Sequence, residues 1–359
     1  MFQHLKDIIT HTKKPDQTIL DLLVNTTIGT NGAKYQHLHT AKKIHTLIKP
    51  NYITIRRNNK AVGNMTVCER PLFVKEKEID SLYVRYFAFA NLFQSKGKQV
   101  KKDRQSTFEK YLKVLFTTSN MDVQSPEHKP SVYWAFIDPE NNKSWNMADR
   151  FGFETIGYFS TYAFSRFFPK LNTSVSSIKS SEIESTWHEL KHFYKDYSNL
   201  SRTHLFEGNN YFVYRVNGLI VAGIQVFDIH WRIDALPGKK GKVLVNTLPY
   251  IPLLKRIVNP KSYKFLATEG LFWKGGHESV VEKLLEAVLA EKKRHSFLMW
   301  FDDGDDKLIN QFNSMNVGIM QKMKADNSIE ILAKFNNFDS KMKADMVDSK
   351  KYISGFDTT

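Results

Sequence analysis

The sequence lacks several features that would assign the chain to a class at once. Its single cysteine, Cys68, cannot form a disulfide within the chain, which excludes a disulfide-stapled secreted fold and favours a reducing compartment. No stretch approaches about 18 uninterrupted apolar residues, so no transmembrane helix is expected. The first residues also lack the apolar core and cleavage site of a signal peptide. We therefore expect a cytoplasmic protein without a membrane partner.

Acidic residues are few relative to basic ones. The 37 Asp and Glu residues face 52 Lys and Arg residues, which gives a net charge of +15 with histidine neutral. This excess favours an anionic partner such as nucleic acid, an anionic membrane or a polyphosphate cofactor, with a solvated basic surface as the alternative. The hydrophobic content of 42% over 359 residues can build the cores of about two domains and excludes a disordered chain.

An internal repeat organises the chain. Residues 52–63 and 211–223 each predict a strand, an Asn-containing turn and a second strand, with Tyr, Arg, Asn and Val at matching spacings. Each copy continues with a glycine-containing loop, an amphipathic helix and an aromatic strand that ends in Asp. In the first copy the helix is expected around 108–115 and the strand at 132–138; in the second copy they are expected around 281–288 and at 297–302. Two copies of one α/β module explain this order.

The repeat predicts a mixed α/β fold with two domains. The N-terminal domain covers 1–170, a Ser/Thr-rich linker covers 171–181, and the C-terminal domain covers 182–338. An apolar, proline-rich insertion at about 234–262 is expected to be a packed excursion that could wall a cleft. Residues 339–359 are expected to be a polar tail that frays.

The loop after the strand at 82–90 is a candidate anion site. It contains Gly97 and opens a helix, so backbone N–H groups and the positive end of the helix dipole converge there. A glycine lets the backbone approach a phosphate closely. Five cations surround it: Lys96, Lys98, Lys101, Lys102 and Arg104. They favour a cofactor with several phosphates, against the alternative of a solvated basic helix start.

Two motifs carry a family resemblance. The loop has the form Gln94-x-x-Gly97-x-Gln99, and downstream come Asn141-x-x-Ser144 and a Gly-Phe-Glu sequence at 152–154. In these motifs the chain resembles the GNAT superfamily of acyl-CoA-dependent N-acyltransferases, in which tandem arrangements are known. The resemblance covers 50–168 and, through the repeat, 182–335 more loosely. It implies two tandem GNAT-like domains, each a splayed central β-sheet flanked by helices.

The resemblance also implies an acyl-CoA site in the first copy. The pantetheine arm would pair with the main chain of Phe87, Ala88 and Phe89. The pyrophosphate would rest on the backbone amides of the loop residues Gln94, Ser95, Lys96, Gly97, Lys98 and Gln99. The Asn-x-x-Ser element, Asn141 with Ser144, would approach the arm. A deprotonated amine of a small molecule or peptide would attack the thioester directly, most simply in acetyl-CoA or otherwise in another acyl-CoA.

The chain departs from the family pattern at the proton-transfer positions. Ala148 stands where many members have a tyrosine acid, and Tyr83 stands where a glutamate is common. Tyr83 is therefore a candidate catalytic residue, with a packed strand aromatic as the alternative. The motif positions of the second copy carry other residues, so the first copy is expected to bind the cofactor and the second to shape the acceptor site. Two alternative functions stay open. One is a catalytically silent module that binds acyl-CoA or another ligand, and the other is a tRNA-dependent aminoacyl or peptidyl transferase of related paired-domain fold.

Three other patterns are interpreted as structural. The His-Glu-x-x-His sequence at 188–192 has no third ligand at a familiar spacing and fits one turn of an amphipathic helix. The histidines at 37, 39 and 45 have no cysteine or carboxylate close in sequence, so no metal is expected. The acidic run at 302–306 is expected to cap a helix. No motif of a nucleic-acid-binding module is present, and no nucleic-acid partner is expected.

Overall fold

The computed structural model describes residues 8–29, 33–89, 107–236, 238–323 and 328–359. Its helices are α1 (Gln17–Val24), α2 (Thr40–His45), α3 (Thr107–Leu115), α4 (Asn142–Arg150), α5 (Ile183–Phe193), α6 (Gly238–Thr247), α7 (Pro252–Ile257), α8 (Val280–Glu291), α9 (Asp306–Ser314), α10 (Ile319–Met323) and α11 (Ser340–Asp348), with 3-10 turns η3 (Ser180–Glu182), η4 (Glu207–Asn209) and η5 (Leu248–Tyr250). Its strands are β1 (Ile9–Thr12), β2 (Lys34–His37), β3 (Pro50–Arg57), β4 (Lys60–Val74), β5 (Lys77–Phe89), β6 (Ser131–Ile137), β7 (Glu154–Ser165), β8 (Val175–Ser177), β9 (Tyr197–Leu200), β10 (Tyr211–Val216), β11 (Leu219–Ala235), β12 (Tyr263–Trp273), β13 (Ser296–Asp302), β14 (Ser328–Asn336) and β15 (Lys350–Lys351).

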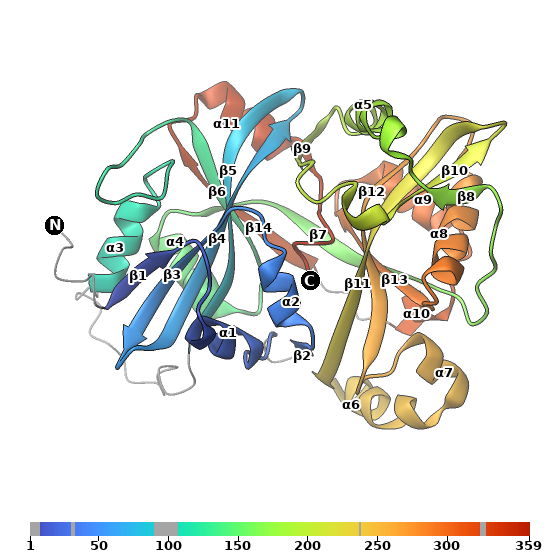
Figure 1. The fold of residues 1–359 in the computed structure, drawn as a ribbon, viewed down its shortest axis with the longest axis horizontal. Coiled ribbons are helices and arrows are strands. Elements are labelled where there is room, and N and C mark those ends of the chain that lie inside the picture. Colours follow the sequence, from blue (N-terminus) through green and yellow to red (C-terminus); the bar gives the residue numbers. More distant parts are fainter. Residues whose placement is uncertain (1–7, 30–32, 90–106, 237, 324–327) are drawn as a thin grey trace.

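The strands form one continuous mixed sheet with helices packed on it, which confirms the mixed α/β class (Figure 1). The main order is β1-β3-β4-β5-β6-β14-β7-β13-β12-β11-β10-β8. The pairs β5–β6 and β12–β13 are parallel, whereas the hairpins β3–β4 and β10–β11 and the pairs β4–β5 and β11–β12 are antiparallel. The two halves of the sheet therefore share one strand pattern.

The two predicted hairpins are confirmed and match in detail. Each has a two-residue turn with positive φ at both positions, Asn58–Asn59 in the first and Asn217–Gly218 in the second. Such turns match the right-handed twist of the flanking strands, and Asn and Gly tolerate the conformation best. In both hairpins the register shifts just before an arginine, Arg56 or Arg215. Each arginine pairs with an acidic residue beside a helix start, Asp16 before α1 or Glu182 before α5.

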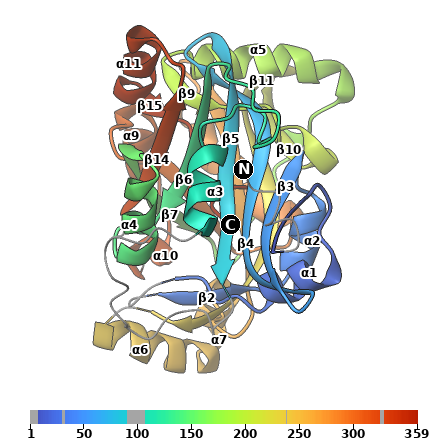
Figure 2. The same cartoon turned by 90° about the vertical axis from the view of Figure 1, so that its left-hand side faces the viewer.

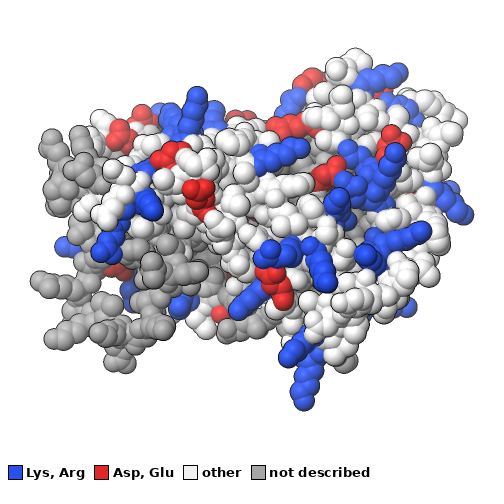
Figure 3. Space-filling model, turned by 60° about the horizontal axis from the view of Figure 1, so that its bottom comes forward, with Lys and Arg blue, Asp and Glu red and all other residues white. Residues whose placement is uncertain are grey.

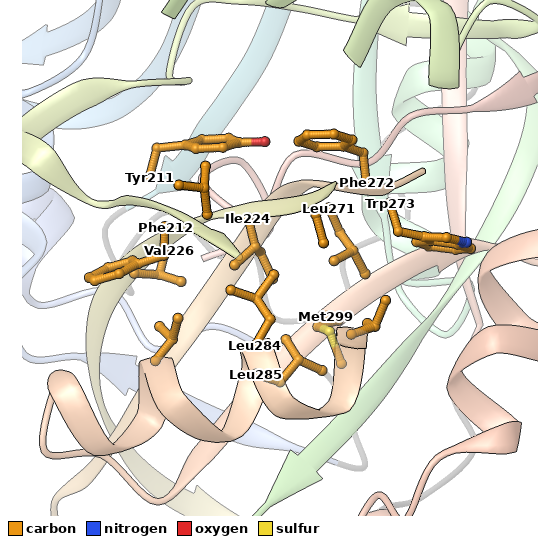
Figure 4. Close-up of a cluster of buried hydrophobic side chains, with 14 of the residues drawn as sticks. Tyr211, Phe212, Ile224, Val226, Leu271, Phe272, Trp273, Leu284, Leu285 and Met299 are labelled. Atoms are coloured by element: carbon orange, nitrogen blue, oxygen red, sulfur yellow. The ribbon is translucent and has the colours of Figure 1, made fainter. Parts of the chain in front are cut away.

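The helix that the repeat predicts after each bulged strand is also present. In α8 the stripe of Val281, Leu284, Leu285 and Val288 is fully buried. Figure 4 shows Leu284 and Leu285 pointing from α8 toward Ile224, Val226 and Met299 of the sheet. Burial of each such side chain contributes about 1.5–3 kcal/mol relative to exposure. In the first half, Leu112 and Leu115 of α3 are buried on the equivalent face, where α3 lies across β5 (Figure 2).

The halves exchange strands, which the sequence does not predict. Strand β14 belongs to the second half of the chain, yet it lies between β6 and β7 of the first half and is antiparallel to both. Strand β7, from the end of the first half, pairs with β13 of the second half. Residues 171–181 are likewise part of the sheet, because β8 pairs with β10 there. The second half thus completes the sheet of the first half.

The expectation of a fraying tail at 339–359 is wrong. Residues 340–348 form α11, β15 pairs with β9, and nearly all of residues 351–359 are buried. Gly355 lies so close to β12 that a Cβ atom there would be 2.2 Å from the carbonyl oxygen of Thr268. Figure 1 places this end of the chain between the two halves. The segment expected to be an insertion, 234–262, contains α6, η5 and α7, and its Leu248, Ile257 and Val258 are buried.

Candidate functional site

The central feature of the first half is a gap between two parallel strands. Strands β5 and β6 pair only from Asp80–Ser131 to Tyr83–Trp134. Three residues after Tyr83, Tyr86 has a φ of 49°, and Tyr86 and Phe87 together stand opposite the single residue Met65 of β4. A bulge of this kind bends the strand that carries it. Strand β5 therefore diverges from β6 and leaves backbone groups that β6 does not pair.

A cavity of about 490 Å³ fills this gap. Its lining includes side chains from both faces of the sheet. Met65, Leu112 and Phe116 belong to the core under α3, whereas Tyr83, Phe159 and Trp300 belong to the core on the opposite face. The cavity thus passes through the sheet, so two molecules could meet in it from opposite sides.

The buried end of the chain forms one wall of the cavity with Asp357, Thr358 and Thr359. Both Asp357 carboxylate oxygens accept hydrogen bonds from the Arg70 guanidinium, one of them from Nη1 at 3.2 Å. Arg85 Nη1 lies 3.8 Å from the same carboxylate. Burial by itself would raise the pKa of Asp357, but Arg70, His204 and Arg85 hold that pKa below its usual range. The wall therefore carries a permanent carboxylate that is paired with arginine.

A cluster of aromatic rings forms a second wall. Strand β2 pairs with β11, and this brings the rings of Tyr35, His37 and Trp231 together. The Tyr35 and Trp231 rings stack with centroids 4.4 Å apart, and the His37 ring lies 5.7 and 5.2 Å from them. His37 is 8% exposed, and its Nε2 has no hydrogen-bond partner among the described residues. Burial lowers the pKa of His37, and the nearby charges of Lys43 and Arg85 lower it further. His37 is therefore a neutral and weakly basic imidazole that lines the cavity.

The sequence-predicted site residues fall into three groups. Phe87, Asn141, Ser144 and Tyr83 line the cavity, and the structure brings these four together. Ala88 and Phe89 do not line it; they lie beyond the bulge, opposite Asn64 and Gly63 of β4. The loop residues Gln94, Ser95, Lys96, Gly97, Lys98 and Gln99 lie outside the described residues.

Two of the cavity residues already have partners. The Oδ1 atom of Asn141 accepts a hydrogen bond from the Ser144 backbone N–H at 3.2 Å, so Asn141 caps α4. The Tyr83 hydroxyl donates to the carbonyl oxygen of Asp357 at 3.1 Å, and its ring stacks on Trp134. Burial raises the pKa of Tyr83 far above its ordinary value. Tyr83 therefore anchors the C-terminal segment and keeps its proton at neutral pH.

The second half has the same gap, but the chain itself fills it. Strands β12 and β13 pair only at Leu266–Phe297 and Ala267–Leu298, and three residues after Ala267 a bulge occurs at Gly270, whose φ is 62°. The remaining cavity measures about 20 Å³ and is lined by residues 351–353. The Lys351 backbone N–H donates to Asp302 at 2.9 Å. The gap that is open in the first half is thus closed in the second.

The alternative motifs have structural roles. His188 and His192 lie exposed on α5, whose buried face carries Trp187 and Leu190. Asp305 caps α9 by accepting from the Leu308 backbone N–H at 3.1 Å, as expected. The described residues hold no cluster of three or more side chains suited to a metal ion.

His37 and Asp357 were missed as cavity residues. The sequence suggests His37 only as one of three neighbouring histidines, and Trp231 of β11, which its ring stacks on, is almost 200 positions away. Asp357 lies in a polar segment that carries no motif. A pairing between β2 and β11 or between Arg70 and Asp357 leaves no local sequence pattern.

Solved structures share this fold. A crystal structure of Saccharomyces cerevisiae N-myristoyltransferase with bound myristoyl-CoA superimposes with a TM-score of 0.55 at 10% identity, over 91% of this chain and 79% of that one. A second structure of the yeast enzyme, with myristoyl-CoA and inhibitors, gives 0.54 at 10% identity, over 92% and 83%. The chain has a tandem GNAT fold. This fold confirms the architecture that the repeat and the two motifs implied.

Sequence comparison by itself does not find this relationship. No protein-family profile matches the chain, and no curated protein sequence matches it. At 10% identity the tandem GNAT fold is shown by the arrangement of the strands. The bulge and splay of β5 and β6 are the local features on which the site depends.

Proposed function

We propose that the chain is an acyl-CoA-dependent N-acyltransferase whose acyl donor binds in the first half. The observation that carries this proposal is the cavity of about 490 Å³ that passes through the sheet where β5 leaves β6. The backbone that β6 leaves unpaired along Val84–Phe87 can pair with the amides of a pantetheine arm, because an exposed strand edge accepts an extended partner. The yeast structures with the same fold contain myristoyl-CoA. The phosphate-binding role of Gln94–Gln99 stays a prediction.

The reaction that fits the cavity is direct transfer. A neutral amine attacks the thioester carbonyl through its nitrogen; the new C–N bond forms, the nitrogen loses a proton, the C–S bond breaks, and the thiolate leaves and takes up a proton. We assign the acceptor of the nitrogen's proton to His37, which lines the cavity. Because burial lowers the pKa of His37, its imidazole is a weak base and takes the proton only after attack has made the nitrogen strongly acidic. Backbone N–H groups of β5 can stabilise the oxyanion that develops on the carbonyl.

Acetyl is the simplest acyl group, but the cavity favours a longer one. Under α3 and α4 the wall consists of apolar side chains: Met65, Leu112, Phe116, Met147, Phe151 and Phe153. A two-carbon acyl group covers little of this surface, whereas a long chain removes much of it from water and gains about 0.8 kcal/mol per buried CH₂ group. We therefore propose a medium or long acyl chain as the transferred group, with acetyl as the second candidate.

Ligand-induced stabilisation tests the donor. Myristoyl-CoA, acetyl-CoA and free CoA are added separately, and the melting temperature is followed. A ligand at about 100 times its Kd stabilises the folded state by about 2.7 kcal/mol. We expect the order myristoyl-CoA, then acetyl-CoA, then free CoA. Equal shifts for all three would refute the long acyl chain, and no shift with any of them would refute the proposed donor and leave a tRNA-dependent reaction.

A variant of the cavity tests whether acyl-CoA binds there, and a second assay tests whether the chain transfers the acyl group or only binds it. Ala135 of β6 lines the cavity, so Ala135→Phe is expected to abolish the shift, whereas Ala344→Phe on the exposed face of α11 keeps it. Release of the CoA thiol with pooled amine acceptors then measures transfer. Binding without thiol release would make the chain a silent acyl-CoA-binding module.

A further inference from the structure

The insertion between β11 and β12 is unusually basic. Residues 238–264 contain seven Lys and Arg residues and no Asp or Glu. Leu248, Ile257 and Val258 of the insertion are buried in the core that it shares with the second half. Figures 1 and 2 show α6 and α7 at the base of the molecule, beyond the strands of the sheet. Its outer face is therefore open to a partner.

Large hydrophobic side chains gather on this outer face. Tyr250 is 76% exposed and Leu253 is 50% exposed, and Val243 and Ile251 are exposed as well. Phe168 also belongs to the group, because the Arg256 guanidinium lies 5.3 Å from its ring. These five account for five of the twelve large hydrophobic side chains that are exposed in the described part of the chain. Exposed hydrophobic side chains concentrated in one short segment differ from the scattered ones of an ordinary surface and mark an interaction site.

A basic cleft of about 350 Å³ opens beside these residues. Six basic side chains line it, and none of its lining residues is acidic: Lys255, Arg256, Lys264, Lys293, Arg294 and His295. In Figure 3, which brings the base of the molecule forward, many Lys and Arg side chains project around this end, with few Asp and Glu side chains among them. Arg294 pairs with Asp228, which lies outside the cleft lining, at 2.9 Å. The cleft still holds more basic than acidic side chains, and such an excess attracts phosphate groups.

We propose that the outer face of the α6–α7 insertion docks on an anionic phospholipid membrane. A lipid phosphate occupies the basic cleft, while Tyr250, Ile251 and Leu253 enter the boundary between headgroups and acyl chains. Lysines on apolar surface can keep their charged ends at the headgroup level, and tyrosine is favoured at the same depth. This proposal goes beyond the acyltransferase function and does not depend on it.

The chemistry of the face favours a membrane over nucleic acid. A basic cleft alone would suit a phosphate backbone. Aliphatic side chains such as Val243, Ile251 and Leu253 gain nothing from phosphates or base edges, but they gain free energy in hydrocarbon. The expectation of no membrane partner rested on the absence of a spanning segment, and no helix in the described residues could cross a bilayer. Docking on one leaflet needs no such helix.

Vesicle sedimentation tests the proposal on the whole chain without acyl-CoA. Vesicles of phosphatidylcholine with about one third phosphatidylserine are compared with pure phosphatidylcholine vesicles, at about 0.1 M salt. We expect binding only to the anionic vesicles. Because each basic residue near such a surface contributes about a fivefold gain in partitioning, Lys255→Glu combined with Arg256→Glu is expected to lower partitioning about tenfold or more.

Two further variants make the test specific. Tyr250→Ser with Leu253→Ser is expected to weaken binding while leaving all charges in place, because it removes only the apolar contacts. Lys60→Glu with Lys77→Glu makes the same charge change at exposed positions of the first half and is expected to keep binding within about twofold of the unaltered chain. Circular dichroism checks that each variant folds.

Four results would overturn the proposal. They are no sedimentation of the unaltered chain with anionic vesicles, an equal loss in the Lys60/Lys77 control, full competition by inorganic phosphate, and tighter binding of a poly-uridine RNA that displaces the vesicles. The third result would make the cleft a site for free phosphate, and the fourth would make the face a nucleic-acid surface.

Discussion

The ion pair between Arg70 and Asp357 offers the sharpest test of the structure. It joins β4 to the last residues of the chain, 287 positions later, and its side chains are 3% and 1% exposed. Substitution of Asp357 by Asn keeps the shape of the side chain and removes its charge. The Arg70 guanidinium then stays buried without a counter-ion, and Arg85 loses the same partner.

The cost follows from this burial. Breaking a buried pair on one side destabilises a protein by about 3–5 kcal/mol, because the remaining charge is uncompensated. With an m-value of about 3 kcal/mol per M, Asp357→Asn is expected to lower the urea midpoint by about 1 M or more. Urea unfolding followed by tryptophan fluorescence measures this shift.

An exposed pair in the same segment provides the control. Asp345 of α11 pairs with Lys75, and these side chains are 33% and 49% exposed. Solvent screens such a pair, so Asp345→Asn is expected to leave the midpoint nearly unchanged. Equal midpoints for the two variants would show that the C-terminal segment is not held by its buried carboxylate, and the described wall of the cavity would then be wrong.

Three further outcomes are expected. Burial raises the pKa of Glu269 to about 8, so between the ordinary value of 4.5 and pH 8 the folded state binds more protons than the unfolded state, and stability falls as pH rises. His204, whose pKa burial lowers to about 3, and Lys43, whose pKa burial also lowers, act in the opposite direction. The contribution of Glu269, about 1.4 kcal/mol per pH unit between pH 6.5 and 8, is therefore expected as the difference in slope between the unaltered chain and Glu269→Gln; equal slopes would contradict it. His37→Ala is expected to lower kcat/KM by about 10²-fold or more without weakening acyl-CoA binding, as measured by thiol release and calorimetry; an unchanged rate would remove His37 from the proton path. Gly355→Ala places a Cβ atom against the backbone of β12 and is expected to cost about 1–3 kcal/mol in urea unfolding, whereas Gly275→Ala, in open space, is expected to cost less; similar costs would contradict the close approach.

Local patterns in the sequence are enough to predict the elements that build each half. The stripe of α8, the Asn-containing turns of the two hairpins and the acidic cap of α9 each depend on residues within a few positions of one another. Periodicity and turn chemistry act at that range, so these predictions are confirmed. The order of the elements and two motifs also indicate the tandem GNAT fold.

The cavity depends on contacts that no local pattern encodes. Its walls need the bulge at Tyr86, the pairing of β2 with β11 that carries His37 inward, and the burial of Asp357 by Arg70. Charged residues such as Asp357 give the C-terminal segment the composition of a solvated tail, but Asp357 is paired with Arg70, 287 positions away. Composition and spacing thus determine the modules and their repetition. Only tertiary structure decides which of the two strand gaps stays open, because the segment that fills one of them comes from the far end of the chain.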